Sequence, residues 1–237
     1  FCDSLKPDFF LLGETLHGDY NQIMNDEMLH SVTNYECYKG LYSSFNCMNM
    51  FEINHSLLRQ FGPENWTLYK GKHLLSFVDN HDVTRVASIL NNANHLPLIY
   101  TLAFGMPGIP CVYYGSEWGA TGRKEDGDPA LRVSFDTPIW NDLTTFISKL
   151  AVAKKSSNAL NYGSFSSIVL TNEQCIFLRQ YNDERVLVAI NASEQPYFAS
   201  FNIGTDTCTD LISGSEIKLN NGMELPGYSS FILQPFS

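Results

Sequence analysis

Short apolar runs alternate, up to about residue 155, with longer stretches in which apolar residues recur at helical spacing. The apolar runs predict four strands, with the first of them fully buried, at residues 9–12, 31–35, 74–78 and 109–114. The helical spacing predicts helices at residues 46–61, 86–90, 96–104 and 142–155. This alternation is typical of parallel strands joined by helices, so we expect an α/β architecture over residues 1–155.

The pattern changes beyond residue 156, where short β-rich runs are separated by turn residues. The runs lie at residues 167–170, 175–181, 185–190, 197–201 and 229–233. Turns are predicted at residues 182–184 and at Asn221-Gly222. We therefore expect a second domain over residues 156–237, an all-β antiparallel module.

Composition and charge narrow the class of protein. Hydrophobic residues make up 44% of the 237 positions and charged residues 17%, which is typical of a globular chain with a sizeable core. The formal net charge of −10 offers no basic surface for a phosphate backbone, so nucleic acid is not an expected partner. No apolar stretch reaches the roughly 18 residues that span a bilayer, so no membrane partner is expected either.

The six cysteines are scattered, with no CxxC pair, which argues against a structural zinc site. Their apolar surroundings favour buried thiols in a reducing compartment over disulfides. The first residues show no basic segment followed by an apolar core, as a signal peptide would. Both observations favour a cytoplasmic location, although the chain does not begin with Met.

Polar residues follow three of the four predicted parallel strands: Glu14, residues 80–82 and Glu117. The carboxyl ends of such strands share one face, so Glu14 and Asp82 are candidates for one acidic pocket. Two carboxylates can act as proton donor and charge stabiliser in glycoside cleavage. The same residues could equally be helix caps or solvated strand ends, and spacing alone does not separate these two interpretations.

Three segments carry a resemblance to a known family. Residues 13–19 (Gly-Glu-Thr-Leu-His-Gly-Asp), 77–82 (Phe-Val-Asp-Asn-His-Asp) and 108–117 resemble, in the same order, the motifs that end strands five, seven and eight of the α-amylase family of retaining glycoside hydrolases. The resemblance implies the C-terminal half of a (β/α)8 TIM barrel, strands five to eight, followed by a C-terminal antiparallel β-sandwich. It also implies activity on α-1,4-linked glucans or maltodextrins.

The resemblance assigns roles to individual residues. Glu14 matches the general acid/base, and His81 and Asp82 match the pair that holds sugar hydroxyls at the cleavage subsite. Further substrate-binding positions are implied at Asp128 and Arg132, for which a surface salt bridge is the alternative, and at His17, where Leu16 replaces a frequent Trp. No metal ligands and no cofactor are expected in this chain. The calcium ligands of the family would lie in a preceding part.

One family feature is absent from the sequence. The nucleophile of the family is an Asp in a Gly-x-Arg-x-Asp pattern before the Glu14 motif, and no such pattern occurs here. We therefore expect the C-terminal part of a larger enzyme, inactive by itself, that pairs with the missing half-barrel or with a second copy. A noncatalytic carbohydrate-binding or subunit fragment and a transglycosylase of the same fold remain alternatives.

Overall fold

Four short parallel strands lie side by side in chain order in the first part of the protein. The computed structural model describes residues 1–236 and pairs β1 (Leu12–Gly13) with β2 (Ser31–Val32). It also pairs β3 (Leu75–Phe77) with β4 (Ile109–Cys111), and a parallel bridge between Thr33 and Leu75 joins the two pairs. The order β1-β2-β3-β4 is that of consecutive barrel strands, which confirms the predicted half-barrel.

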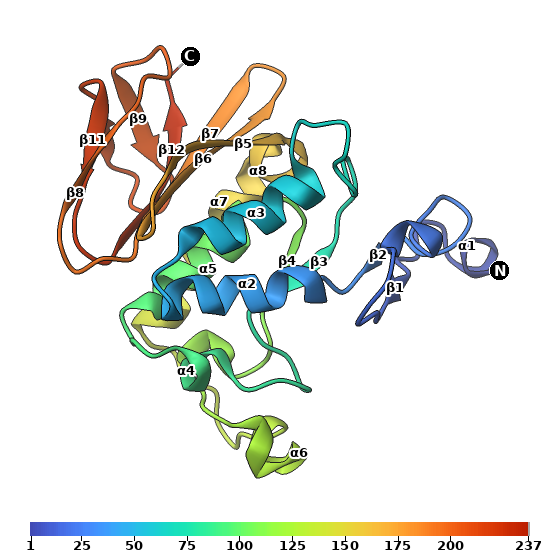
Figure 1. The fold of residues 1–237 in the computed structure, drawn as a ribbon. Helices are drawn as coiled ribbons and strands as arrows, with labels where there is room; N and C mark the ends of the chain where they lie inside the picture. Colours follow the sequence, from blue (N-terminus) through green and yellow to red (C-terminus); the bar gives the residue numbers. More distant parts are fainter. Residues whose placement is uncertain (237) are drawn as a thin grey trace.

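Helices connect the last three of these strands and lie beside β3 and β4, whereas β1 and β2 stand away from the helices (Figure 1). Between β2 and β3 lie α2 (Tyr35–Asn46) and α3 (Met50–Phe61), and between β3 and β4 lie α4 (Val86–Ile89) and α5 (His95–Gly105). After β4 come α7 (Asp142–Ser156) and α8 (Asn158–Tyr162). The shorter helical turns are α1 (Cys2–Leu5), η1 (Tyr20–Gln22), η2 (Ser116–Trp118), η3 (Lys124–Asp126) and α6 (Asp128–Leu131).

Three predicted strands in this part were wrong in extent, among them the one at residues 109–114, since β4 ends at Cys111. The run at residues 9–12 is not a buried strand, because only Leu12 of that run is in β1 and the side chains of Phe9 and Phe10 are about half exposed. Residues 31–35 were predicted as a strand and the following helix from about residue 46. Instead β2 ends at Val32, and Asn34 caps a separate helix, α2, by accepting a hydrogen bond from the Cys37 N–H at 3.3 Å.

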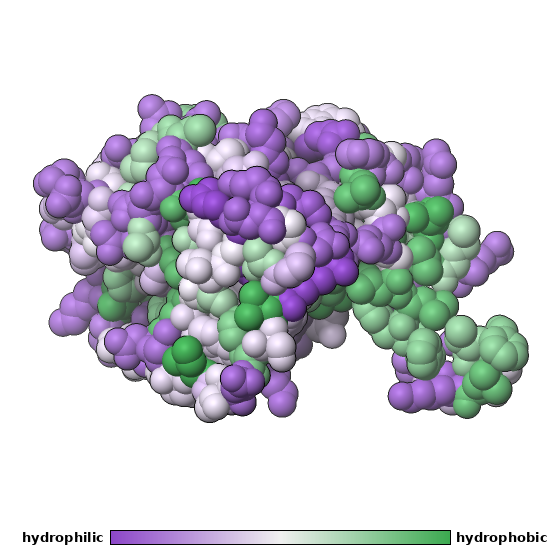
Figure 2. Space-filling view, turned by 90° about the horizontal axis from the view of Figure 1, so that it is seen from below, coloured by the Kyte–Doolittle hydropathy of each residue, from purple (hydrophilic) through white to green (hydrophobic). Residues whose placement is uncertain are grey.

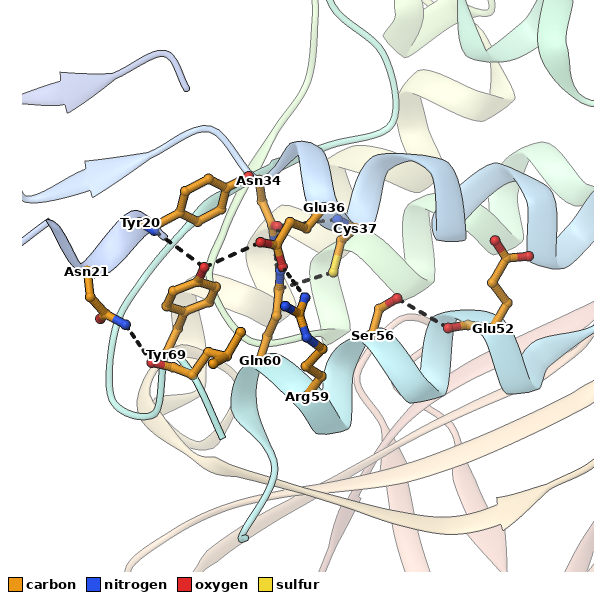
Figure 3. A network of polar contacts seen from close by, with 11 residues as sticks. Tyr20, Asn21, Asn34, Glu36, Cys37, Glu52, Ser56, Arg59, Gln60 and Tyr69 are labelled. Atoms are coloured by element: carbon orange, nitrogen blue, oxygen red, sulfur yellow. Dashed lines mark hydrogen bonds and ion pairs between the residues drawn. The ribbon is translucent and has the colours of Figure 1, made fainter. Parts of the chain in front are cut away.

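A network of polar side chains ties the segment after β1 to the helical body (Figure 3). The Glu36 carboxylate on α2 accepts hydrogen bonds from Arg59 at 2.8 Å, Gln60 at 3.2 Å and the Tyr69 hydroxyl at 3.4 Å. The Tyr69 hydroxyl accepts one from the Tyr20 N–H, and the two rings stack 5.2 Å apart. Burial, followed by the charge of Glu36, raises the pKa of Tyr20 to about 12. This network fixes the loop that follows Glu14.

The second part contains a six-stranded antiparallel sheet in the order β10-β9-β12-β7-β6-β5 and a two-stranded sheet of β11 and β8. The strands are β5 (Ser164–Leu170), β6 (Gln174–Tyr181), β7 (Glu184–Asn191), β8 (Tyr197–Ser200), β9 (Thr207–Asp210), β10 (Glu216–Lys218), β11 (Gly222–Leu225) and β12 (Ser229–Pro235). The antiparallel module is confirmed. The strands β9, β10 and β11 were not predicted.

Side chains alternate between the two faces of the large sheet. Ile176, Leu187 and Leu233 pack toward the small sheet, whereas Phe177 and Val188 join the core of the helical part. A Cβ at Gly105, the last residue of α5, would lie 2.7 Å from Val188, so a glycine is needed where α5 reaches the sheet. The two parts therefore share a tightly packed, largely apolar contact.

The expectation of buried thiols holds for part of the set. Cys37, Cys175 and Cys208 are buried, Cys2 and Cys111 are partly exposed, and Cys47 is exposed; all six are free thiols. Within residues 1–236, no helix has the length and hydropathy needed to cross a membrane.

Candidate active site

Glu14 lies directly after β1, at the carboxyl end of the strand, and its side chain is exposed. Asn80, His81 and Asp82 lie in the loop after β3, three to five positions beyond Phe77, the last residue of that strand. One side-chain oxygen or ring nitrogen from each of Glu14, His81 and Asp82 lies within 4.8 Å of the other two. The structure thus brings together three of the predicted site residues, although more than 60 positions separate Glu14 from the other two.

Asp82 is held by an ion pair with Arg132 and by a contact with the His81 ring. Its Oδ1 lies 3.1 Å from an Arg132 guanidinium nitrogen, and its Oδ2 lies 3.3 Å from Nε2 of His81. The carboxylate is 41% exposed, so it is oriented by these contacts and still open to a ligand. Because water screens such half-exposed pairs, they orient the carboxylate but add little to the stability of the fold.

Arg132 and Asp128 come from the loop around α6. Arg132 also lies 3.8 Å from Asp128, and Asp128 lies 3.6 Å from Lys124. Asp128 therefore forms the exposed ion pairs that the sequence offered as the alternative reading, while Arg132 reaches the carboxylate at the centre of the cluster. His17 is exposed in the loop after β1. Across residues 1–236, no hydrogen bond or ion pair joins His17 to Glu14, His81 or Asp82.

Tyr35 and Asn80 connect the two carboxylates. The hydroxyl of Tyr35, at the start of α2, donates to Oε1 of Glu14 at 3.5 Å and accepts from the Asn80 amide at 2.8 Å. The Asn80 side chain in turn accepts a hydrogen bond from the Asp82 N–H at 2.8 Å. Burial raises the pKa of Tyr35, which keeps its hydroxyl protonated and able to donate. Sequence reasoning missed Tyr35 because residues 31–35 were interpreted as a strand.

A layer of buried polar side chains around Asp79 lies next to the exposed cluster of Glu14, His81 and Asp82. Asp79 accepts hydrogen bonds from the Val86 N–H and the Ser116 hydroxyl, each at 2.7 Å. Burial raises the pKa of Asp79, and these two bonds offset part of that effect. Its Oδ1 and Oε2 of Glu117 are buried without a hydrogen-bond partner in the part of the chain that the structure describes. Glu117 therefore belongs to this layer and not to the exposed cluster.

Arg85 joins three loops from within that layer. Its fully buried guanidinium donates to the carbonyls of Tyr114 and Leu131 and to the Ser116 hydroxyl. It also lies 4.2 Å from the centre of the Tyr113 ring. Because Leu131 directly precedes Arg132, this contact fixes the backbone from which Arg132 reaches Asp82. A single Arg three positions after Asp82 was the only sequence signal for this role.

Family models match almost the whole chain. The model described as "Alpha amylase, catalytic domain" matches residues 1–166, and the one described as "Maltogenic Amylase, C-terminal domain" matches residues 168–232. The former covers more than half of the chain.

Individual proteins are similar over different spans. A cyclomaltodextrinase from Thermoanaerobacter pseudethanolicus is 25% identical over 97% of this chain and 40% of its own length. A cyclomaltodextrin glucanotransferase from Thermoanaerobacterium thermosulfurigenes is 30% identical over 69% of this chain and 23% of its own length. The crystal structure of a cyclomaltodextrin glucanotransferase with a three-domain ABC distribution superposes with a TM-score of 0.84 at 23% identity, covering 98% of this chain and 51% of that one. The chain thus spans less than half the length of the two curated relatives and about half of the solved structure.

Proposed function

Because the chain belongs to the α-amylase family, we propose that its site takes part in retaining cleavage of α-1,4-linked glucans, with Glu14 as the general acid and base. The observation that carries this proposal is the convergence of Glu14, His81 and Asp82 within 4.8 Å of one another at the carboxyl ends of β1 and β3. A glycosidic oxygen needs a proton donor on one side and a fixed negative charge near the developing positive charge of the ring.

The contacts of each residue suit its proposed role. Glu14 is exposed and free to approach a leaving oxygen, while Asp82 is oriented by Arg132 and His81. A fixed carboxylate interacts most strongly with the sugar ring when that ring carries positive charge. It therefore stabilises the transition state more than the bound substrate, which lowers the activation free energy. His81 and Arg132 would also donate to sugar hydroxyls, with Asp128 and His17 at the edges of the binding surface.

The covalent step requires a nucleophilic carboxylate. In the family this is the Asp of a Gly-x-Arg-x-Asp pattern, which does not occur in these 237 residues. In the proposed mechanism that nucleophile comes from a segment outside the chain, and Glu14 first protonates the leaving oxygen and later deprotonates water. We assign no metal to the cluster, because the Arg132 guanidinium that pairs with Asp82 would repel a cation.

Transglycosylation is the second candidate, and the similarity to cyclomaltodextrin glucanotransferases favours it. The glycosyl intermediate is the same, and only the acceptor differs, being a sugar hydroxyl in place of water. Product analysis with maltoheptaose separates the two, since transfer gives products longer than the substrate or cyclic products.

The test is Glu14→Gln in the protein as its host makes it. With maltoheptaose, whose leaving group needs a proton, we expect kcat to fall by roughly 10²–10⁴-fold. With a maltosyl fluoride, whose leaving group needs none, the loss should be much smaller. Glu27→Gln, an exposed carboxylate on the same loop, is the matched control and should leave both rates unchanged.

Equal losses on the two substrates would contradict the role of Glu14 as the acid. A second arm assays residues 1–237 alone, for which we expect no release of reducing sugar from maltoheptaose. Release that Glu14→Gln abolishes would contradict the requirement for an outside nucleophile and would remove the alternative of a noncatalytic fragment.

A further inference from the structure

A hollow lies at the end of the strands opposite to Glu14 and Asp82, where the chain enters β3 and β4. We name it the foot pocket. Its volume is about 520 Å³, and it is lined by residues 61–63, 70–73, 107–108 and 161–166 together with Arg179 and Tyr181. An adjoining hollow of about 390 Å³ shares His73, Gly108, Asn161 and Tyr162 with it and includes Lys154. The two hollows therefore lie side by side.

The charged side chains that line the two hollows are all positive. They are Lys70, Lys72 and Arg179 in the foot pocket and Lys154 in the adjoining hollow, and neither hollow is lined by an Asp or a Glu. The chain as a whole has 25 acidic and 15 basic residues, so a basic hollow without a carboxylate is opposite to its overall charge. Local positive potential in a concave site attracts anions.

Two of these cations are buried. Arg179 is 1% exposed and donates to the carbonyls of Gly105, Gly163 and Ser164, which uses three of its five N–H groups. Lys154 is 7% exposed and donates to the carbonyls of Met106 and Leu160, which uses two of its three. For the residues that the structure describes, no carboxylate lies within ion-pair distance of either side chain.

The carbonyls that accept from Arg179 and Lys154 satisfy most of the N–H groups of these side chains. They do not neutralise the two positive charges. All of these carbonyls except that of Ser164, which opens β5, lie at the C-terminal ends of α5 and α8. Cations are favoured there, but a helix end supplies only about half an elementary charge. Burial, followed by the charge of Arg179, lowers the pKa of Lys154 to about 7, and burial lowers that of Arg179 to about 9. Burial, followed by the charges of Lys154 and Arg179, also lowers the pKa of His73, so these surroundings disfavour a further positive charge.

We propose that the foot pocket, together with the adjoining hollow, binds a small oxyanion of the phosphate type. Arg179 from the foot pocket and Lys154 from the adjoining hollow are its buried donors, and Lys70 and Lys72 lie at the rim. An oxyanion offers several acceptors and a full negative charge to the unused N–H groups, and a guanidinium matches its geometry. Tyr162 and Tyr181 stand beside the pocket with ring centres 5.8 Å apart, and both are more than a third exposed. Their rings suit the sugar of a phosphorylated sugar as well as a free anion beside it.

This proposal is independent of the reaction at Glu14, because the foot pocket lies at the other end of the strands. Its test is isothermal titration of the protein as its host makes it with inorganic phosphate at about pH 7, against sodium chloride of equal ionic strength. We expect saturable binding of one phosphate. Lys154→Met should weaken it at least tenfold, whereas Lys39→Met, an exposed lysine on α2, should not change it.

Two further arms sharpen the result. Sulfate keeps a constant charge between about pH 6 and about pH 9, so its affinity should fall above pH 7 as Lys154 loses its proton, and this fall should vanish in Lys154→Met. Glucose 1-phosphate in place of phosphate distinguishes the two sources of the anion. If glucose 1-phosphate binds more tightly than phosphate, and Tyr162→Ser removes this advantage, the ligand is a phosphorylated sugar. If the two bind equally well, the ligand is the free anion.

The proposal is overturned if phosphate binds no better than chloride, or if Lys154→Met binds phosphate as well as the wild-type chain does. If the buried substitution prevents folding, the rim double variant Lys70→Gln/Lys72→Gln replaces it. Unchanged phosphate affinity in that variant overturns the proposal in the same way.

Discussion

At the scale of single residues, burial decides the chemistry of Lys154. Lys154 lies in the last turn of α7, and its ammonium group is buried. The carbonyls of Met106 and Leu160 accept hydrogen bonds from it, and the charge of Arg179 acts on it. Its pKa falls from 10.5 in an exposed lysine to about 7, with burial as the larger cause. A lysine that loses its proton near neutral pH makes the stability of the protein depend on pH.

The sign of this dependence follows from proton binding. Between pH 7 and 10.5 the unfolded chain holds a proton on Lys154 that the folded chain has lost, so the free energy of unfolding rises with pH. The contribution is at most roughly 1.4 kcal/mol per pH unit. We expect Lys154→Met to remove it, so that the variant's stability relative to wild type is highest near pH 7 and declines toward pH 9.

Urea denaturation in phosphate-free buffer at several pH values measures this difference. Lys39→Met, the exposed control, should show no trend with pH. A difference between Lys154→Met and wild type that stays constant from pH 7 to pH 9 would show that Lys154 keeps its proton in the folded chain.

At the scale of elements, α7 shows how a helix start is specified locally. The Asn141 side chain accepts a hydrogen bond from the Thr144 N–H at 3.0 Å, and the Thr144 hydroxyl accepts one from the Asn141 N–H at 3.4 Å. The Asn141 amide also donates to the Trp118 carbonyl, which connects α7 to the loop after β4. This reciprocal cap satisfies two N–H groups that the helix itself leaves open.

We therefore expect Asn141→Ala to lower the free energy of unfolding by about 1 kcal/mol, with some further loss from the Trp118 contact. The matched control is Asn94→Ala, because Asn94 stands at the start of α5 without a side-chain cap hydrogen bond. Thermal denaturation of both variants is the measurement. Equal effects of the two substitutions would show that the cap of α7 contributes nothing specific.

At the scale of the whole molecule, an apolar N-terminal extension stands away from the body. Phe1, Leu5, Phe9, Phe10 and Leu12 are all more than two fifths exposed. Figure 2 shows apolar residues gathered over this extension, at the right of the view. Within residues 1–236, β1 pairs only with β2, so one edge of β1 is open. An open strand edge beside an apolar surface favours association.

We expect the 237-residue chain to self-associate at micromolar concentration, or to bind the remaining half of the barrel when that half is supplied. Phe9→Ser/Phe10→Ser should weaken self-association, whereas Phe51→Ser, an equally exposed aromatic residue on α3, should not. Sedimentation equilibrium decides: a wild-type mass that stays at 26.7 kDa would contradict the expectation.

The sequence alone determined the approximate order of strands and helices and the side of the strands on which the site residues meet. The residues at Glu14 and at 80–82 follow strands, and parallel strands place their carboxyl ends on one face, so their convergence was predictable from order alone. The short β-rich runs separated by turn residues likewise indicated an antiparallel module. The division at residue 155 stays a prediction, as do the roles assigned to the site residues.

Only the tertiary structure decided the features that depend on partners distant in sequence. The helix at Tyr35–Asn46 is rich in Tyr, Ser and Cys, which are modest helix formers, and it is stabilised by packing against α3. The exposure of Phe9 and Phe10 depends on what covers β1, and no local pattern encodes that. Tyr35 at the site, Arg85 beneath it and Lys154 at the foot pocket each acquire a role from backbone groups or side chains more than five positions away, because burial and hydrogen bonding are set by the fold and not by neighbours in the chain.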